Sequence, residues 1–236
     1  MPKHLAILGY HKIGAPSAGN WETWYYVPTA TFETQMKQLR DGGWNMIDVA
    51  TLLRALDSPD ELPERAALIT FDDGYRSVLR DAAPVLADEG FPAVVFVPTQ
   101  FIGSASTFDA NSPEPVEPIC SWDELRELER AGISVQSHGV SHTTFSDLSN
   151  AQIEREISAS KTALEERLEK AVTLFSYPYN DAGRDRDFSS RALVRAGYRA
   201  AFHFTGGVSA WPPAHDRFRI SRVPVWPDTD LRNALS

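Results

Sequence analysis

The sequence lacks several features that would place it in other classes of protein. Its 236 residues include one cysteine, Cys120, so no disulfide can form within the chain. No run approaches the roughly 18–20 apolar residues that cross a bilayer, so we expect no membrane span. Basic residues are outnumbered, with 23 Lys and Arg against 32 Asp and Glu, for a formal charge of −9. This balance argues against a general nucleic-acid binder, which needs dense lysine and arginine.

The N-terminal segment 1–10 has too short an apolar run for a secretory leader, and it has no small-residue cleavage pattern. As read, the chain is expected to be cytoplasmic; a cell-envelope or secreted location would follow if a leader had been removed. The sequence does not indicate an oligomeric state. Hydrophobic residues make up 42% of the chain, which is typical of a globular protein and consistent with one domain over 1–236.

Short apolar runs alternate with helical patterns along almost the whole chain, which predicts a parallel α/β fold. Periodicity alone does not distinguish an open sheet from a closed barrel. The expected strands are 5–10, 45–48, 66–71, 93–97, 133–137, 172–176, 199–204 and 218–225. The expected helices are 31–40, 49–54, 75–88, 121–130, 150–170 and 188–195.

Two adjacent acids, Asp72 and Asp73, follow the apolar strand 66–71 and precede Gly74. Neighbouring strand residues point to opposite faces, so both carboxylates can face one cavity only if the chain bends there, which Gly74 permits. Two close carboxylates then call for a cation or a shared proton. The alternative is a solvated turn whose acids cap the next helix.

Two of the six histidines, His138 and His142, lie four residues apart at the end of the strand 133–137. This spacing lets both imidazoles reach one ion if the chain turns after the strand. Two histidines and one carboxylate form a common hydrolytic zinc set that leaves positions open for water and substrate.

A third strand end carries Ser176, Tyr177, Pro178 and Tyr179. Functional sites of α/β folds gather at the carboxyl ends of strands, so the three ends together describe the rim of a cavity. Pro178 fixes the local backbone, and the amide of Tyr179 could then face a developing oxyanion. Without the other motifs, Tyr-Pro-Tyr would be read as core packing.

Two irregular stretches are candidates for functional loops. The long loop 103–119 contains three prolines, and long loops inside compact domains are usually functional. The stretch 14–28 carries Trp21, Trp24, Tyr25 and Tyr26, which could stack on sugar rings or simply cover the bottom of a barrel.

The motifs resemble those of the polysaccharide deacetylases, which form carbohydrate esterase family four and share the NodB-homology domain. Thr70–Gly74 matches the first family motif, and His138 to His142 matches the His-x-x-x-His metal motif, with Gly139 where Ser or Thr is usual. The opening Leu8-Gly9-Tyr10-His11 and the segment 220–225 are similar to a bacterial branch that begins with a Tyr-His strand. The resemblance implies a distorted, TIM-barrel-like (β/α)7 barrel.

The resemblance also implies roles for individual residues. Asp73, His138 and His142 would bind a divalent metal, zinc by default and Co²⁺ or Ni²⁺ as alternatives. Asp72 would be the general base, and the backbone N–H of Tyr179 would stabilise the oxyanion.

Two departures from the family pattern concern the acid and base. Ser176 stands where an arginine usually pairs with the catalytic acid, and Arg222 is the candidate replacement, with a surface role as the alternative. The usual late histidine motif is missing, because His203 and His215 lie in other contexts. We assign His11, Tyr177 and Pro178 to substrate binding, with a core role as the alternative for His11.

The sequence thus predicts a metal-dependent hydrolase that removes N-acetyl groups from amino-sugar residues of a glycan or oligosaccharide. One alternative is a related hydrolase acting on a non-sugar or cyclic amide, and another is a catalytically weak sugar-binding module on the same fold. A glycosidase would use two separated carboxylates without a metal.

Overall fold

A computed structural model describes residues 3–16, 23, 25–110, 114–213 and 216–235. Within them, seven parallel strands close into a barrel, because β1 pairs with β5 on one side and with β11 on the other. This confirms the (β/α)7 barrel. In order around the ring, the strands are β1 (Lys3–Tyr10), β5 (Ala66–Phe71), β6 (Ala93–Val97), β7 (Ile133–Ser137), β8 (Leu174–Ser176), β9 (Ala200–Phe204) and β11 (Ile220–Pro224).

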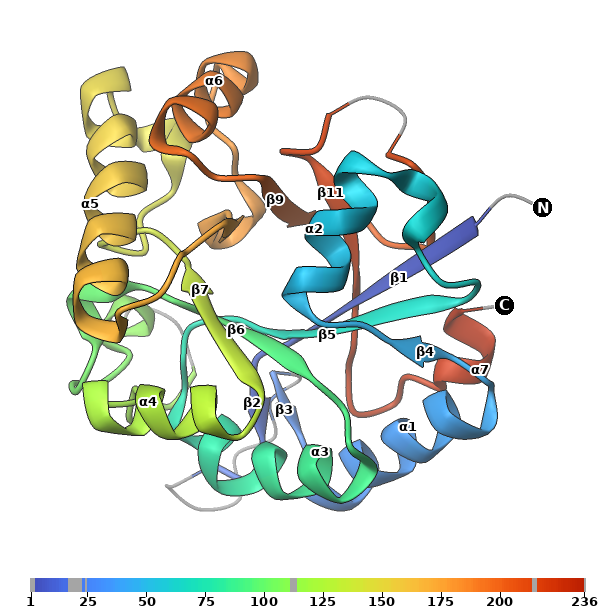
Figure 1. The fold of residues 1–236 in the computed structure, drawn as a ribbon. Helices are drawn as coiled ribbons and strands as arrows, with labels where there is room; N and C mark the ends of the chain where they lie inside the picture. Colours follow the sequence, from blue (N-terminus) through green and yellow to red (C-terminus); the bar gives the residue numbers. More distant parts are fainter. Residues whose placement is uncertain (1–2, 17–22, 24, 111–113, 214–215, 236) are drawn as a thin grey trace.

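The helices form an outer layer around most of this ring (Figure 1). They are α1 (Thr29–Asp41), α2 (Val49–Asp57), α3 (Ala83–Glu89), α4 (Trp122–Arg130), α5 (Asn150–Leu168), α6 (Arg186–Ala196) and α7 (Leu231–Ala234). Their caps follow the sequence: Ser121 and Glu124 form a capping box at α4, and Gly90 and Gly197 end α3 and α6 in the left-handed conformation.

The strands bury both faces, which is why their sequences are continuous apolar runs. Alternate residues form two hydrophobic clusters. Leu5, Ile7 and Leu68 belong to the cluster that fills the barrel and also includes Phe96 and Phe202, whereas Ala6, Leu8 and Ile69 pack outward against the helices. On the inward face this two-residue period continues from Leu68 to Thr70 and Asp72.

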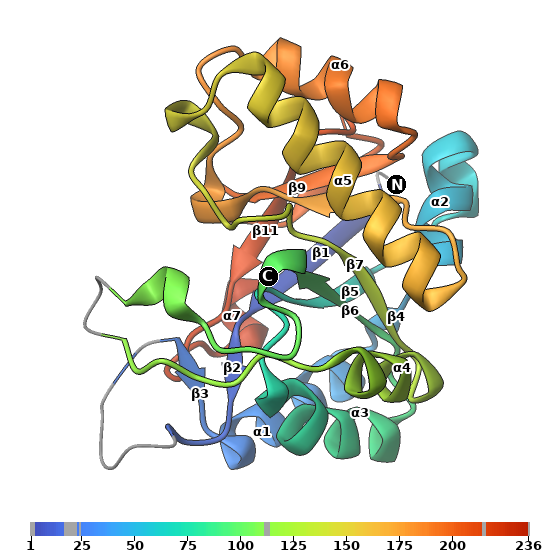
Figure 2. The ribbon, with the colours of Figure 1, turned by 90° about the vertical axis from the view of Figure 1, so that its left-hand side faces the viewer.

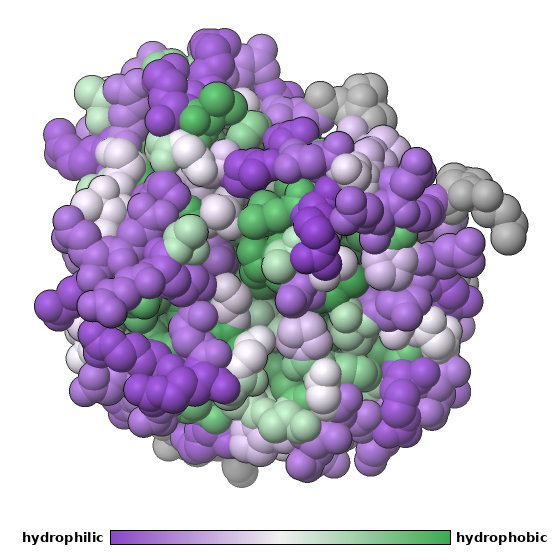
Figure 3. Space-filling view, viewed as in Figure 1, coloured by the Kyte–Doolittle hydropathy of each residue, from purple (hydrophilic) through white to green (hydrophobic). Residues whose placement is uncertain are grey.

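The two ends of the barrel differ. Helix α2 crosses one end and packs Leu52, Ala55 and Leu56 onto the interior cluster (Figure 1). From that side the surface is mostly hydrophilic, with hydrophobic residues near the middle (Figure 3). The described parts of two long connections, 99–110 with 114–119 and 11–16 with 25–27, lie at the opposite end, beyond the carboxyl ends of the strands (Figure 2).

Several element boundaries differ from those predicted. The helix predicted over 75–88 contains a π turn over Val78–Ala82, because Pro84 has no N–H to donate to the preceding turn. Strand β4 (Asn45–Met46) is shorter than predicted. The antiparallel edge strand β10 (Ser209–Trp211) and the small pair β2 (Lys12–Ile13) and β3 (Tyr26–Val27) were not predicted. No helix among the described residues has the length and apolarity needed to span a bilayer.

Candidate active site

The turn after β5 brings Asp72 and Asp73 to the same cavity. Asp73 and Gly74 both have φ near +70°, so two successive left-handed residues reverse the usual alternation of side chains. Gly74 is required for space as well, since a Cβ there would lie 3.0 Å from both methyl groups of Val97. The bend expected from the glycine is therefore present, and it is packed rigidly against the neighbouring strand.

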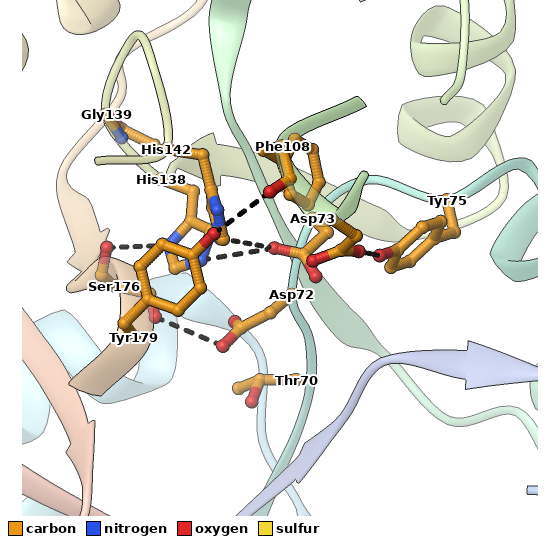
Figure 4. A network of polar contacts seen from close by, with 12 residues as sticks. Thr70, Asp72, Asp73, Tyr75, Phe108, His138, Gly139, His142, Ser176 and Tyr179 are labelled. Carbon is orange, nitrogen blue, oxygen red and sulfur yellow. Dashed lines mark hydrogen bonds and ion pairs between the residues drawn. The ribbon is translucent and has the colours of Figure 1, made fainter. Parts of the chain in front are cut away.

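Asp73, His138 and His142 converge beneath the rim (Figure 4). The Oδ1 atom of Asp73 lies 3.0 Å from Nε2 of His142 and 3.4 Å from Nε2 of His138. One ligand atom from each residue falls within 4.8 Å of the others, and all three side chains are buried. His142 adopts a left-handed φ of 52°, which turns its ring back toward the strand end.

The chemistry of these donors fits a divalent cation. The Nδ1 atom of His138 lies 2.7 Å from the carbonyl oxygen of Ser176, and this contact places the ring proton on Nδ1. In the neutral ring, Nε2 then presents a lone pair toward the carboxylate of Asp73. Converging lone pairs repel one another unless a positive charge lies between them, and one carboxylate with two imidazoles is a set that zinc prefers.

The pKa shifts of Asp73 and His138 also indicate that this site favours a positive charge. Burial opposes the ionisation of Asp73, but His142 and His138 outweigh it and hold the pKa of Asp73 well below its usual value. Burial lowers the pKa of His138, yet the carboxylates of Asp72 and Asp73 raise it above its usual value on balance. The pocket therefore favours a proton or a cation among these three ligands.

Asp72 is held by a guanidinium from the last strand of the barrel. Arg222 donates from Nη1 to Oδ1 at 2.8 Å and from Nη2 to Oδ2 at 2.6 Å, and neither side chain is appreciably exposed. Burial raises the pKa of Asp72, but Arg222 and His138 outweigh this effect, so the pKa lies below its usual value. The Arg222 side chain is fully buried, which excludes the surface role considered for it.

Two hydroxyl groups complete the support of this pair. Arg222 also donates to Oγ of Ser176 at 2.8 Å and to Oγ1 of Thr70 at 3.1 Å. Ser176, where the family usually has an arginine, thus contacts the arginine that reaches the same place from β11. Thr70 and Ser176 were missed as site side chains, although both continue the inward face of their strands past a buried leucine.

A cavity of about 360 Å³ opens above Asp72, Asp73 and the two histidines. Its walls are largely aromatic and come from several strand ends and loops. Besides the acids and imidazoles, they include His11, Tyr25, Tyr179, Phe204 and Trp226. Asp109 of the long loop lines this cavity and a shallower adjoining groove, and it accepts a hydrogen bond from the Tyr75 hydroxyl at 2.8 Å. Asp109 lies in the loop 103–119 that was expected to be functional, although no motif marks the residue itself. Phe204 and Trp226 lie in segments without a recognisable motif and were not predicted.

His11 follows β1 and lies between the rings of Tyr25 and Phe204, at centroid distances of 5.0 and 6.0 Å. It lines the cavity, so its position is not that of an enclosed core histidine. Burial is the main cause that lowers its pKa, against the opposing influence of Asp73 and Asp72. His203 instead contacts the carbonyl of Arg219, and His215 lies outside the described residues.

The residues of the segment 177–179 differ in position: part of the segment packs in the core, and part lines the cavity. Tyr179 lies at the rim with half of its surface exposed, and its ring meets the edge of His142 at 4.5 Å. The ring of Tyr177 packs against Phe145 and Phe175, although the residue also borders the cavity. Pro178 was predicted to bind substrate, but it is buried and does not line the cavity. It packs near Gly139 instead.

The aromatic stretch predicted near the N-terminus is described only in part. Tyr25 lines the cavity, while Tyr26 is buried, and Trp21 and Trp24 lie outside the described residues. Tyr25 therefore does not cover the bottom of the barrel, because the cavity that it lines lies at the carboxyl ends of the strands.

Known proteins resemble the chain in both sequence and fold. "Putative polysaccharide deacetylase YxkH" of Bacillus subtilis is 30% identical over 230 residues, covering 96% of this chain and 73% of the relative. "Poly-beta-1,6-N-acetyl-D-glucosamine N-deacetylase" of Staphylococcus epidermidis is 25% identical over 85% of this chain and 68% of its own length.

Two solved structures share the fold. The Streptococcus pyogenes deacetylase PplD in complex with acetate superposes over the full length of both chains with a TM-score of 0.84 at 21% identity. IcaB from Ammonifex degensii gives a TM-score of 0.79 at 24% identity, covering 96% of this chain and 93% of its own. The family model described as "Polysaccharide deacetylase" matches residues 60–201, which include the Asp-Asp and His-x-x-x-His motifs. The chain therefore belongs to the polysaccharide deacetylase family and is an amide-hydrolysing enzyme of that family.

Proposed function

We propose that this chain is a zinc-dependent N-deacetylase that releases acetate from N-acetylglucosamine residues within a glycan. The observation that carries the proposal is a buried Asp73, His138 and His142 ligand set beside a second carboxylate, Asp72, which binds an arginine instead. Relatives named for poly-β-1,6-N-acetyl-D-glucosamine support a β-linked amino-sugar polymer as the substrate. Cobalt or nickel would suit the same ligands.

Each residue of the site has a separate task in this reaction. A divalent ion held by Asp73, His138 and His142 would supply Lewis acidity toward water and toward the amide carbonyl oxygen. Asp72 accepts a proton as the water oxygen forms a bond with the carbonyl carbon. Arg222 keeps the buried carboxylate ionised and fixes the direction of its oxygens. The backbone N–H of Tyr179 donates to the carbonyl oxygen as negative charge develops on it.

The bond between the carbonyl carbon and the sugar nitrogen then breaks, and the nitrogen needs a proton to leave as an amine. His11 lines the same cavity as Asp72 and Asp73, and we assign to it contact with the substrate. The proton that Asp72 has taken from water is available to the leaving nitrogen, so that Asp72 ends the reaction ionised again. The rings of Tyr25 and Trp226, which both line the cavity, would give the sugar an apolar face against which to pack.

The direct test is acetate release from N-acetylated β-1,6- and β-1,4-linked glucosamine oligosaccharides by the zinc-loaded protein, with the chelated protein as control. We expect zinc-dependent acetate release from at least one series. Release confined to small non-sugar or cyclic amides would reassign the substrate. Binding of the oligosaccharides without any turnover in the presence of zinc, cobalt or nickel would indicate a sugar-binding module.

A further inference from the structure

The turn that connects the two histidines of the metal site is held by a carboxylate from a different element. Glu156 lies on α5, and its Oε2 accepts hydrogen bonds from the backbone N–H of Val140 at 2.7 Å and of Ser141 at 2.9 Å. Its Oε1 accepts a hydrogen bond from the Ser141 hydroxyl at 2.7 Å. Both carboxylate oxygens of Glu156 therefore accept hydrogen bonds from Val140 and Ser141, which lie between His138 and His142 in the chain.

This carboxylate is almost fully buried, with 9% of the residue exposed, so its contacts do not exchange freely with water. Hydrogen bonds to a charged acceptor in such a setting are stronger than neutral ones. Gly139 makes the approach possible: its φ is +77°, and a Cβ there would lie 3.1 Å from Oε2 of Glu156. The Glu156 carboxylate thus occupies this position because residue 139 has no side chain.

The opposite side of the turn is fixed by backbone groups. The amides of Thr99 and Gln100 donate to the carbonyls of Gly139 and Val140 at 3.1 and 3.0 Å. The turn is therefore held between α5 and the segment after β6. Its conformation determines where His142 points, because His142 follows Ser141 directly and has a left-handed φ of 52°.

We propose that Glu156 is a positioning residue for the metal site: it fixes the 139–141 turn so that the imidazole of His142 meets Asp73 and His138. The proposal rests on the proposed function, in which these three residues hold a divalent ion. Glu156 touches none of the three ligands in the contacts described and acts through the backbone between two of them. Groups that orient metal ligands from outside typically change metal affinity by about 10- to 100-fold when removed.

The test measures zinc affinity by competition with a chromophoric chelator for four folded proteins: wild type, Glu156→Ala, Glu156→Gln and Glu154→Ala. Glu154 is the matched control, because it lies on the same helix but is exposed and pairs with Arg195. We expect Glu156→Ala to weaken zinc binding by about 10- to 100-fold. Glu156→Gln keeps the size and one acceptor oxygen, so a loss at the lower end of that range, about 10-fold, is expected. Glu154→Ala should bind zinc like the wild type.

The outcomes separate a positioning role from a purely structural one. Lower thermal stability of the metal-free Glu156 variants together with wild-type zinc affinity would overturn the proposal and leave the metal site intact. If Glu156→Ala does not fold, the zinc affinity of Glu156→Gln tests the proposal, and an affinity equal to that of the wild type would overturn it. Failure of the wild type itself to bind zinc, cobalt or nickel would overturn the proposed function, and this inference with it.

Discussion

At the scale of single residues, the two adjacent aspartates have opposite partners. Asp73 faces two imidazoles and Asp72 faces a guanidinium, and each carboxylate is kept ionised although burial opposes it. Without these partners two adjacent buried carboxylates would share a proton. In this dipeptide Asp73 is therefore available as a metal ligand and Asp72 as a base, the two roles that the activation of water for hydrolysis requires.

Replacing Asp72 with Asn tests the assigned base. The amide preserves the shape but cannot accept a proton, so we expect turnover to fall by about 10²- to 10⁴-fold. Zinc affinity should stay within a few-fold of wild type, because Asp72 is not in the ligand set. Acetate release and chelator competition measure the two quantities. Near-normal turnover would show that another group acts as the base.

Replacing Arg222 with Met tests the buried ion pair. The change leaves the Asp72 carboxylate without its cation in the barrel, and we expect a loss of about 3–5 kcal/mol in the free energy of unfolding. Urea titration of metal-free protein measures it. Asp72→Asn combined with Arg222→Met removes the stranded charge and should recover much of that loss without restoring activity. Strictly additive effects of the two changes would show that the residues do not interact.

At the scale of elements, the site depends on how three strands end. Strand β5 is followed by a turn with two left-handed residues, β7 by a turn that Glu156 of α5 holds, and β8 by the rim segment that contains Pro178. The motifs were visible in the sequence because each follows an apolar run. The contacts that fix these turns come from outside the motifs, from Glu156 on the helix that follows β7 and from Val97 on the strand that follows β5, so the motifs alone did not reveal them.

Gly74→Ala tests whether the turn after β5 is as rigid as its packing indicates, with Gly90→Ala as the matched control. Both glycines have φ near +70°, but a Cβ at residue 90 meets nothing within 4 Å, whereas at residue 74 it meets Val97 at 3.0 Å. We expect a loss of about 1–2 kcal/mol for Gly90→Ala from the backbone alone. Gly74→Ala should lose about 1–3 kcal/mol more from overpacking. Equal losses in urea titrations would show that the turn relaxes freely.

At the scale of the whole molecule, the barrel brings four chain segments to one point. Asp72 and Arg222 lie 150 positions apart, but Asp72 directly follows β5, Arg222 lies in β11, and both strands pair with β1. A cation at the site would connect the segments that follow β5 and β7, the two neighbours of β6, and its binding energy would add to the stability of the fold.

Zinc should accordingly raise the melting temperature. At a free zinc concentration 100 times the dissociation constant, linkage adds about 2.7 kcal/mol. For a chain of this size that is a shift of roughly 5–10 °C. His142→Ala, which removes one ligand, should abolish most of the shift. Calorimetry with and without a chelator measures it, and an equal shift in both proteins would place the zinc elsewhere.

The sequence by itself determined the order of the elements, the buried strands and the candidate metal ligands, because these depend on local periodicity and on residue types at strand ends. Barrel closure was implied only by family resemblance, since hydrophobic periodicity is the same in an open sheet. Only the tertiary structure decided that Arg222 binds Asp72, that Glu156 holds the histidine turn and that Pro178 packs away from the cavity. These outcomes depend on strand register and on contacts between residues far apart in the chain, which no short stretch of sequence records.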